Sequence, residues 1–293
     1  MLIHGESFDH IGSTRLVHDM NKSAFPFNNS DETLMEKYSN GSQPVFPLSS
    51  IHSIIEIDQV SNINNDNIYL HTSNNPSQIV SSMLSRTGGL RATEVRDSLP
   101  PSSTVSFLSS KPSLPTVVVT NYRSHFSNPM YHSIYDTAAR AGYNYTKEGY
   151  NDGIVSHLAK VSDMISSTIL DLVSGGSPRL NNDEDQKMLI NELLNCYTIT
   201  ANCSMFYEAS VPDIETYPWK YIPEARGKTP FPQYVGVRSS FHTLMTKQVL
   251  QYLTGDKVDV KIDETEEVKT VDDVVKEEMD KCKEMNKGQN IFR

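Results

Sequence analysis

The chain has 293 residues, of which 37% are hydrophobic and 21% are charged, so it can bury one large core or two modest ones. Its net charge of −10 and its pI near 5.4 argue against nucleic acid as a partner. No apolar run reaches the ~18 residues that a membrane-spanning helix needs. Residues 1–3 are too short an apolar start for a signal peptide, so the chain as it stands is expected to carry no signal of its own for secretion or anchoring.

Short apolar segments alternate with polar connections in the N-terminal half. Residues 1–3 are predicted to end a buried strand, and Gly12 and Ser13 to cap a helix that continues to Met20. Residues 21–48, which are rich in Asn, Ser and Pro, are predicted to form a long loop.

Three further strands and a short helix are predicted before residue 121. The strands are residues 54–60, which read as buried, residues 67–71, and residues 116–120, whose apolar run is typical of a central parallel strand. Residues 79–84 are predicted to form a helix that Gly88 and Gly89 stop. The Ser/Pro-rich residues 97–115 are predicted to form a connection.

The second half is predicted to be mostly helical. Apolar residues recur at helical spacing over residues 154–173, 188–206 and 241–252. Strands that alternate with helices predict an α/β fold with a mostly parallel sheet flanked by helices. After Gly255 the composition shifts to Asp, Glu and Lys. We therefore expect a domain over residues 1–255 and a charged tail, solvated or partly helical, over residues 256–293.

The segment GESFDHIGSTR, at residues 5–15, carries the first candidate site. It places one carboxylate, that of Glu6, in the turn between the predicted first strand and the helix. In open α/β sheets, ligands and catalytic groups lie at the carboxyl ends of the strands. We therefore expect Glu6 to belong to a functional site.

Three further islands accompany this segment, namely LVHDMNK at residues 16–22, which follows it directly, LPPSS at residues 99–103 and NPMYHSIYDT at residues 128–137. A weaker echo is ANCS at residues 201–204. On these motifs the chain resembles the co-catalytic zinc aminopeptidase and transferrin-receptor-like superfamily, and within it the nicastrins, over roughly residues 1–255. The resemblance implies a zinc-aminopeptidase-like α/β fold that is truncated at its N-terminus. It also implies that a signal peptide and a single membrane span lie outside this chain.

The resemblance implies that the metal site of the superfamily has degenerated. An active member has two adjacent glutamates after this strand, one acting as base and the next binding metal. Glu6 falls at the base position and Ser7 at the metal-binding position, where a neutral hydroxyl is a poor zinc ligand. Asp58 and His132 fall at two further ligand positions. Alternatively, Asp58 is a turn or cap residue and His132 a partly buried hydrogen-bonding residue. We expect no catalytic residue and no cofactor.

The resemblance also implies a role for the pocket that the lost metals leave. A carboxylate at a strand end could pair with an ammonium group, such as the free amino terminus of a substrate. The implied substrate-binding residues are Glu6, Asp9, His10, Ile11, Gly12 and Ser13. His10 stands where nicastrins have tyrosine and adds a group that titrates near neutral pH. Alternatively, Glu6 holds its own turn by accepting backbone N–H bonds.

The function that the resemblance implies is that of a non-catalytic subunit of the γ-secretase complex. Such a subunit recruits or size-gates the stubs of type I membrane proteins and supports assembly of the complex, while presenilin performs the proteolysis. The ectodomain would then be lumenal or extracellular. Two alternatives are an active zinc-dependent aminopeptidase or carboxypeptidase of the same fold, which Ser7 opposes, and a receptor-like binding domain.

Sequons and cysteines bear on the compartment. Five N-x-[ST] motifs are candidates for glycosylation if the parent protein enters the secretory pathway, at Asn21, Asn28, Asn40, Asn144 and Asn202. The chain also has three cysteines, Cys196, Cys203 and Cys282, without a CxxC pair. On one continuous helix the first two would lie ~10 Å apart, so they are predicted to be half-buried thiols and not a disulfide.

Overall fold

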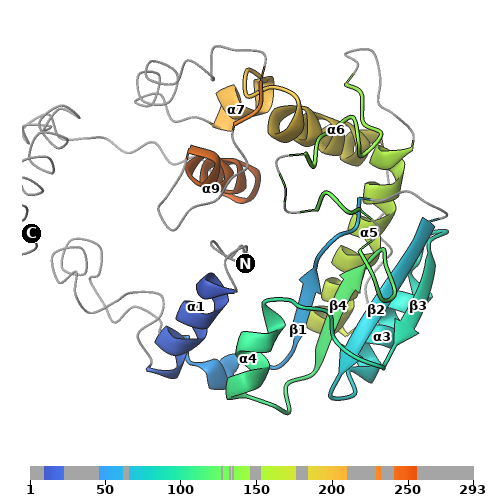
Figure 1. The fold of residues 1–293 in the computed structure, drawn as a ribbon, viewed down its shortest axis with the longest axis vertical. Helices are drawn as coiled ribbons and strands as arrows, with labels where there is room; N and C mark the ends of the chain where they lie inside the picture. The colour runs from blue at the N-terminus through green and yellow to red at the C-terminus, as the bar shows by residue number, and fades with distance from the viewer. Residues whose placement is uncertain are drawn as a thin grey trace, which may run out of the picture. The chain divides into compact units, whose positions relative to one another are not determined.

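The fold contains a four-stranded sheet (Figure 1). The computed structural model describes residues 10–22, 46–61, 66–126, 128–131, 133, 135–145, 153–175, 184–209, 229–231 and 241–255. The strands are β1 (Ile54–Ile57), β2 (Asn67–Ser73), β3 (Arg91–Val95) and β4 (Thr116–Thr120), in the order β1-β4-β2-β3. Three of them match predicted strands, and β3 was not predicted.

The sheet is mostly parallel, as predicted. Strand β1 pairs parallel with β4, and β2 pairs parallel with β3, whereas the middle pair of β2 and β4 is antiparallel. Strand β4 is central and buried at all five positions. The prediction that β1 is buried was wrong, because β1 lies at the edge of the described sheet and the side chain of Ile57 is 53% exposed.

Helices α3 (Ser77–Ser85) and α5 (Ile154–Ser174) supply the apolar side chains that cover one face of the sheet. Successive strand residues point to opposite faces, so Val117 and Val119 of β4 join this core while Val118 points away from it. Helix α5 ends at Gly175, whose φ of 69° is left-handed, as the predicted glycine stop requires.

Two helices and a short 3₁₀ turn form a second core beside β1. They are α1 (Ile11–Asn21), η1 (Leu48–Ser50) and α4 (Thr104–Ser110), and their apolar side chains pack together around Phe107 and Leu114. Helix α4 occupies part of the segment predicted to be a plain connection. Helix α1 was predicted, but it begins earlier than expected, with His10 as its N-cap residue at a φ of 56°.

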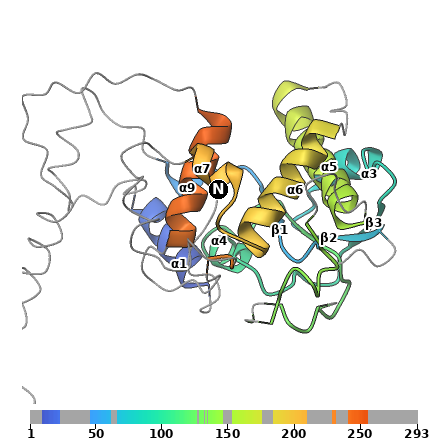
Figure 2. The ribbon, with the colours of Figure 1, turned by 90° about the horizontal axis from the view of Figure 1, so that it is seen from above.

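The remaining helices are α6 (Glu184–Thr198), α7 (Ser204–Ala209) and α9 (Phe241–Thr254), which share a third core (Figure 2). The predicted continuous helix over residues 188–206 was wrong. The backbone N–H groups of Ile199 and Thr200 both bond to the carbonyl of Asn195, so the chain turns out of α6 there. β-Branched residues at positions 198–200 also disfavour continuation of the helix.

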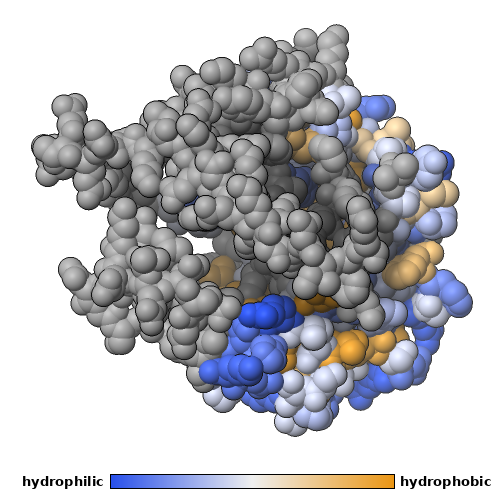
Figure 3. Space-filling model, turned by 60° about the vertical axis from the view of Figure 1, so that its left-hand side comes forward, coloured by the Kyte–Doolittle hydropathy of each residue, from blue (hydrophilic) through white to orange (hydrophobic). Residues whose placement is uncertain are grey.

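Some predictions fall outside the described residues, namely the strand at residues 1–3, most of the loop at 21–48 and the tail at 256–293. The helices that the structure describes include none that is long and apolar enough to cross a bilayer. On the face drawn in Figure 3, the coloured surface is largely hydrophilic, with separate hydrophobic groups between the polar ones. Single exposed apolar residues of this kind are normal for folded domains.

Candidate functional site

The polar residues on and directly after β1 contact the LPPSS and NPMYHSIYDT islands and, through α4, support the start of α1. Ile55 packs against the core under α3 and α5, so its neighbour Glu56 points to the opposite face, toward α4. Its Oε1 accepts hydrogen bonds from Ser103 N at 3.0 Å and Ser103 Oγ at 2.7 Å, and its Oε2 accepts one from Thr104 N at 3.0 Å. Glu56 therefore caps α4 and fixes the LPPSS island.

Helix α4 in turn contacts the start of α1. Ser106 Oγ lies 2.9 Å from Ser13 Oγ and 3.1 Å from Thr14 Oγ1, and Ser13 is fully buried. At the other end of the same interface, Asn21 Nδ2 donates to Ser110 Oγ at 3.2 Å. The second half of the GESFDHIGSTR motif is thus tied through α4 to Glu56 on β1.

Asp58 follows β1 and is held by two tyrosines. Its backbone N–H donates to the carbonyl of Val119 at 3.1 Å, which continues the pairing of β1 with β4. Its Oδ2 accepts a hydrogen bond from Tyr122 Oη at 3.1 Å, and its Oδ1 accepts one from Tyr131 Oη. Burial, followed by the nearby Asp58 carboxylate, raises the pKa of both phenols, so both stay protonated donors.

The NPMYHSIYDT island is anchored at the same place. Asn128 N donates to Gln59 Oε1 at 3.1 Å, and the Asn128 side chain accepts from Met130 N at 2.9 Å and donates to Asp136 Oδ1 at 2.8 Å. This arrangement brings Tyr131 to Asp58. His132, the neighbouring residue, lies outside the described residues, so its predicted place at a vestigial ligand position stays a prediction.

Aromatic rings line this end of the sheet. The ring of Phe126 lies 5.1 Å from that of Tyr122 and 5.4 Å from that of Tyr131, and Phe126 is 49% exposed. Among the described residues, the ion pairs do not include Asp58. Tyr122 is buried, so Phe126 is the ring beside this carboxylate that is most exposed to solvent.

The described residues around Asp58 do not fit a zinc site. Within the part of the chain that the structure describes, one group of His, Cys, Asp and Glu side chains is close enough to share a metal, and it comprises Glu192, Cys196 and Cys203, not Asp58. Those two sulfurs are bonded to each other, so they are not thiolate ligands.

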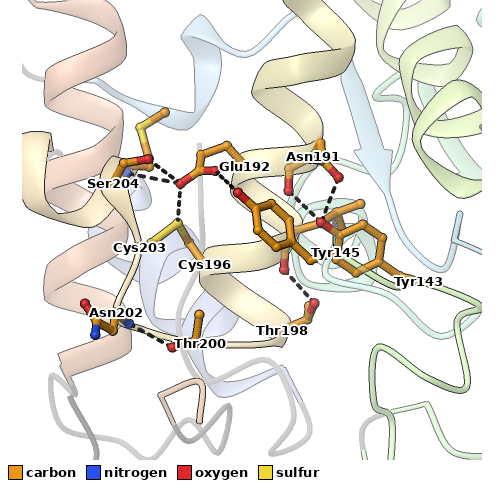
Figure 4. The surroundings of a disulfide bond; sticks show 12 residues. Tyr143, Tyr145, Asn191, Glu192, Cys196, Thr198, Thr200, Asn202, Cys203 and Ser204 are labelled. Carbon is orange, nitrogen blue, oxygen red and sulfur yellow. Dashed lines mark hydrogen bonds between the residues drawn. A yellow bond between two sulfur atoms is a disulfide. The ribbon is translucent and has the colours of Figure 1, made fainter. Parts of the chain in front are cut away.

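The bond between Cys196 and Cys203 corrects the prediction of two thiols (Figure 4). Their Cα atoms are 5.5 Å apart because α6 ends before Cys203 and the chain folds back. Glu192 lies beside the disulfide, where its Oε1 accepts from Ser204 Oγ at 2.6 Å and its Oε2 accepts from Tyr145 Oη at 3.4 Å.

The predicted substrate-binding residues are only partly described. Glu6 and Asp9 lie outside the described residues, whereas His10, Ile11, Gly12 and Ser13 begin α1. Among these four, Ile11 is 51% exposed and Ser13 is buried against α4. Among the sequons, the structure describes three acceptor residues, all exposed, namely Asn21, Asn144 and Asn202. Asn28 and Asn40 lie outside the described residues.

Four residues with organising roles were not singled out from the sequence, namely Glu56, Tyr122, Tyr131 and Glu192. Two of them carried a signal. Tyr131 lies within an island, and Glu56 is a lone carboxylate inside an apolar strand. The other two take their roles from distant partners that no local pattern announces.

Comparison with known proteins identifies the family. The sequence model described as "Nicastrin large lobe" matches residues 1–169, more than half of the chain. Human nicastrin is 26% identical over 279 residues, which cover 87% of this chain and 35% of that protein. The nicastrin of Dictyostelium purpureum is 25% identical over 234 residues, covering 74% of this chain and 33% of that one.

A solved structure supports the fold. The crystal structure titled as that of the gamma-secretase component nicastrin superposes with a TM-score of 0.52 at 18% identity, over 86% of this chain and 43% of that chain. The chain spans about a third of the length of the curated relatives that it matches. The large-lobe match over residues 1–169 establishes that the chain belongs to the nicastrin family.

Proposed function

We propose that this chain is part of the ectodomain of a non-catalytic γ-secretase subunit. In this proposal the parent protein is a single-pass type I membrane protein that assembles with presenilin and the other subunits of the complex. It recruits or size-gates the stubs of type I membrane proteins, and presenilin cleaves them. The observation that carries the proposal is the family match over residues 1–169, together with a solved relative whose title names it a gamma-secretase component.

The geometry at Asp58 supports a non-catalytic role. A co-catalytic peptidase needs carboxylates that are free to bind metal and a base beside the bridging water. Within the described ranges, Asp58 is not part of a group of side chains close enough to share a metal, and its oxygens accept hydrogen bonds from Tyr122 and Tyr131. At the position where the superfamily has a metal-binding glutamate, the sequence has Ser7. Both features favour a pseudo-peptidase over the active zinc peptidase that shares this fold.

We assign substrate contact to Glu6, Asp9, His10, Ile11 and Gly12, whereas the buried Ser13 positions the segment. The contact of Ser13 with Ser106 ties this segment to α4, and Glu56 ties α4 to β1, so the segment has a rigid support. Glu6 is the group that would pair with the ammonium of a substrate amino terminus. A short ectodomain stub presents that amino terminus close to the membrane, and a long ectodomain does not.

The disulfide supports the lumenal or extracellular location. Disulfides form and persist in oxidising compartments and are rare in the cytosol. The bond between Cys196 and Cys203 is buried beside α6 and α7, where it holds the turn between them. The glycosylation sequons are then sites that face a glycosylating compartment, as the proposal requires.

The test uses the full-length protein in cells that lack their own nicastrin. Wild type is expected to co-purify with presenilin and to restore cleavage of a short membrane-protein stub, but not of the same stub with a long ectodomain. Glu6→Gln should reduce that cleavage, and Glu184→Gln, whose side chain is 69% exposed on α6, should not. Failure to co-purify with presenilin would overturn the proposal. Bound zinc with peptidase activity that Glu6→Gln abolishes would establish the alternative.

A further inference from the structure

Two glycosylation sequons meet at one carboxylate, that of Glu192 on α6 (Figure 4). Tyr145, the middle residue of the sequon at Asn144, donates to Glu192 Oε2 at 3.4 Å. Ser204, the last residue of the sequon at Asn202, donates to Glu192 Oε1 at 2.6 Å. Both acceptor asparagines are exposed. The two sequons therefore share one anchoring side chain, and the second has a cysteine as its middle residue.

The disulfide lies inside the second sequon. Cys203, its middle residue, is bonded to Cys196 and is 5% exposed. The backbone before it is also held, because Ala201 N donates to the carbonyl of Thr229 at 3.0 Å and Asn202 N donates to Thr200 Oγ1 at 3.1 Å. Once the disulfide has formed, a covalent bond and these hydrogen bonds therefore hold the sequon in a turn.

Glycan transfer requires that the sequon can change its conformation to fit the transferase. The Asn side-chain nitrogen forms a bond to the anomeric carbon of a sugar carried on a lipid diphosphate. The bond from that carbon to the diphosphate breaks, the lipid diphosphate leaves, and the amide loses one proton. The transferase must hold the Ser or Thr hydroxyl of the sequon at the same time. In the closed turn the Ser204 hydroxyl donates to Glu192 and the intervening residue is covalently tied, so the segment cannot present both groups.

We propose that glycan transfer to Asn202 competes with closure of the Cys196–Cys203 disulfide, so that Asn202 is glycosylated only while Cys203 is a thiol. Closure removes two protons and two electrons from the thiols, which a disulfide-bearing oxidant accepts as it becomes a dithiol. Disulfide formation takes roughly seconds to hours, and synthesis proceeds at roughly 5–20 residues per second, so either step can come first. The inference rests on the proposed function, which places the chain in the secretory pathway.

The experiment measures site occupancy on full-length protein expressed in secretory cells. Peptides are treated with a glycosidase in heavy-oxygen water, which marks each formerly glycosylated asparagine. Cys196→Ser and Cys203→Ser each remove the disulfide and leave the sequon intact, because its middle position accepts any residue except proline. Cys282→Ser is the matched control, and Asn144 is the internal reference. Total cell product is analysed, so that a variant that fails to fold is still counted.

The expected result is that a minority of wild-type chains carry a glycan at Asn202. Cys196→Ser and Cys203→Ser should raise its occupancy to a majority of chains, and Cys282→Ser should leave it unchanged. A membrane-permeant thiol reductant given to wild-type cells should have the same effect as the first two variants. Suppose that Asn144 is glycosylated, and that Asn202 either is fully occupied in wild type or keeps the same occupancy in both cysteine variants. The proposed competition is then wrong, while the proposed function is unaffected. If none of the five sequons carries a glycan, the proposed secretory location is wrong, and the proposed competition is wrong with it.

Discussion

Tyr122 donates a hydrogen bond of 3.1 Å to Asp58, which joins the residue after β1 to a residue that follows the neighbouring strand β4. Tyr131 donates to the other oxygen of the same carboxylate from the NPMYHSIYDT island. Asp58, which the sequence resemblance predicts to be a vestigial metal-ligand position, thereby connects three segments. A side chain with that role is expected to contribute to the stability of the fold.

Replacing either tyrosine should destabilise the fold. Tyr122→Phe or Tyr131→Phe removes one hydrogen bond to a charged acceptor, so we expect a loss of about 1–2 kcal/mol in the free energy of unfolding. Because both bonds end on one carboxylate, the double variant should be non-additive. Urea denaturation measures the effect, with Tyr135→Phe as control because that side chain is 62% exposed. Equal midpoints for Tyr131→Phe and Tyr135→Phe would contradict the structural role.

Because the pKa values of the same two tyrosines are raised, we expect the protein to lose stability at alkaline pH. Burial and the Asp58 carboxylate raise the pKa of Tyr122 and Tyr131 above the ordinary 10.0, so folding favours their protonated forms. The resulting stabilisation is fully present below pH 10.0 and declines as the pH rises above it, since only the unfolded state then ionises readily. Ultraviolet titration of tyrosinate should show a late class of tyrosines that shrinks in the double phenylalanine variant. An unchanged late class would contradict the assignment.

Glu56 should be essential to α4. Glu56→Gln keeps one acceptor but removes the other, together with the negative charge at a helix N-terminus, so we expect a loss of about 1–2 kcal/mol. Denaturant titration compares it with Glu184→Gln, which removes a charge from a side chain that is 69% exposed. The two variants should differ clearly in midpoint. If they coincide, the three hydrogen bonds that Glu56 accepts do not stabilise the fold.

The strands and long helices were predictable because their signals are local. The apolar run of β4 indicated a central strand. In α5, the apolar residues recur at helical spacing up to the glycine stop, and the helix ends at Gly175 in the structure. Strand β3 was missed because it is an edge strand whose residues alternate only weakly between exposed and buried. Helix α4 was missed because its cap comes from Glu56, 47 residues earlier in the chain.

The candidate site was less predictable because long-range contacts assemble it. Asp58 stood out by its position after a strand, but Tyr122 and Tyr131, which hold it, lie 64 and 73 residues away. The disulfide was missed for a local reason. The predicted helix continued to residue 206, whereas α6 ends at Thr198. One helix boundary thus decided whether Cys196 and Cys203 could meet.

A buried histidine joins α5 to the segments on either side of residues 62–65. The side chain of His157 is 1% exposed, and its Nε2 lies 3.0 Å from the carbonyl of Val60 while its Nδ1 lies 2.9 Å from Asp66 Oδ1. Both ring nitrogens thus have an oxygen partner, one from the backbone and one from the Asp66 carboxylate. Lys160 Nζ, 3.3 Å from Asp66 Oδ2, adds a cation beside the same carboxylate.

This cluster predicts a loss of stability in acid. The hydrogen bond from His157, opposed by burial and assisted by Lys160, lowers the pKa of Asp66 below its ordinary 3.8. The stabilisation is present above pH 3.8 and is lost as the pH falls through the lower folded value, because the unfolded state binds the proton first. Asp66→Asn should therefore lower the free energy of unfolding at neutral pH and flatten its decline below pH 3.8. Urea denaturation over a pH series measures this, with Asp97→Asn as control because that side chain is 80% exposed. An acid limb of the same slope in wild type and Asp66→Asn would show that the pair does not contribute.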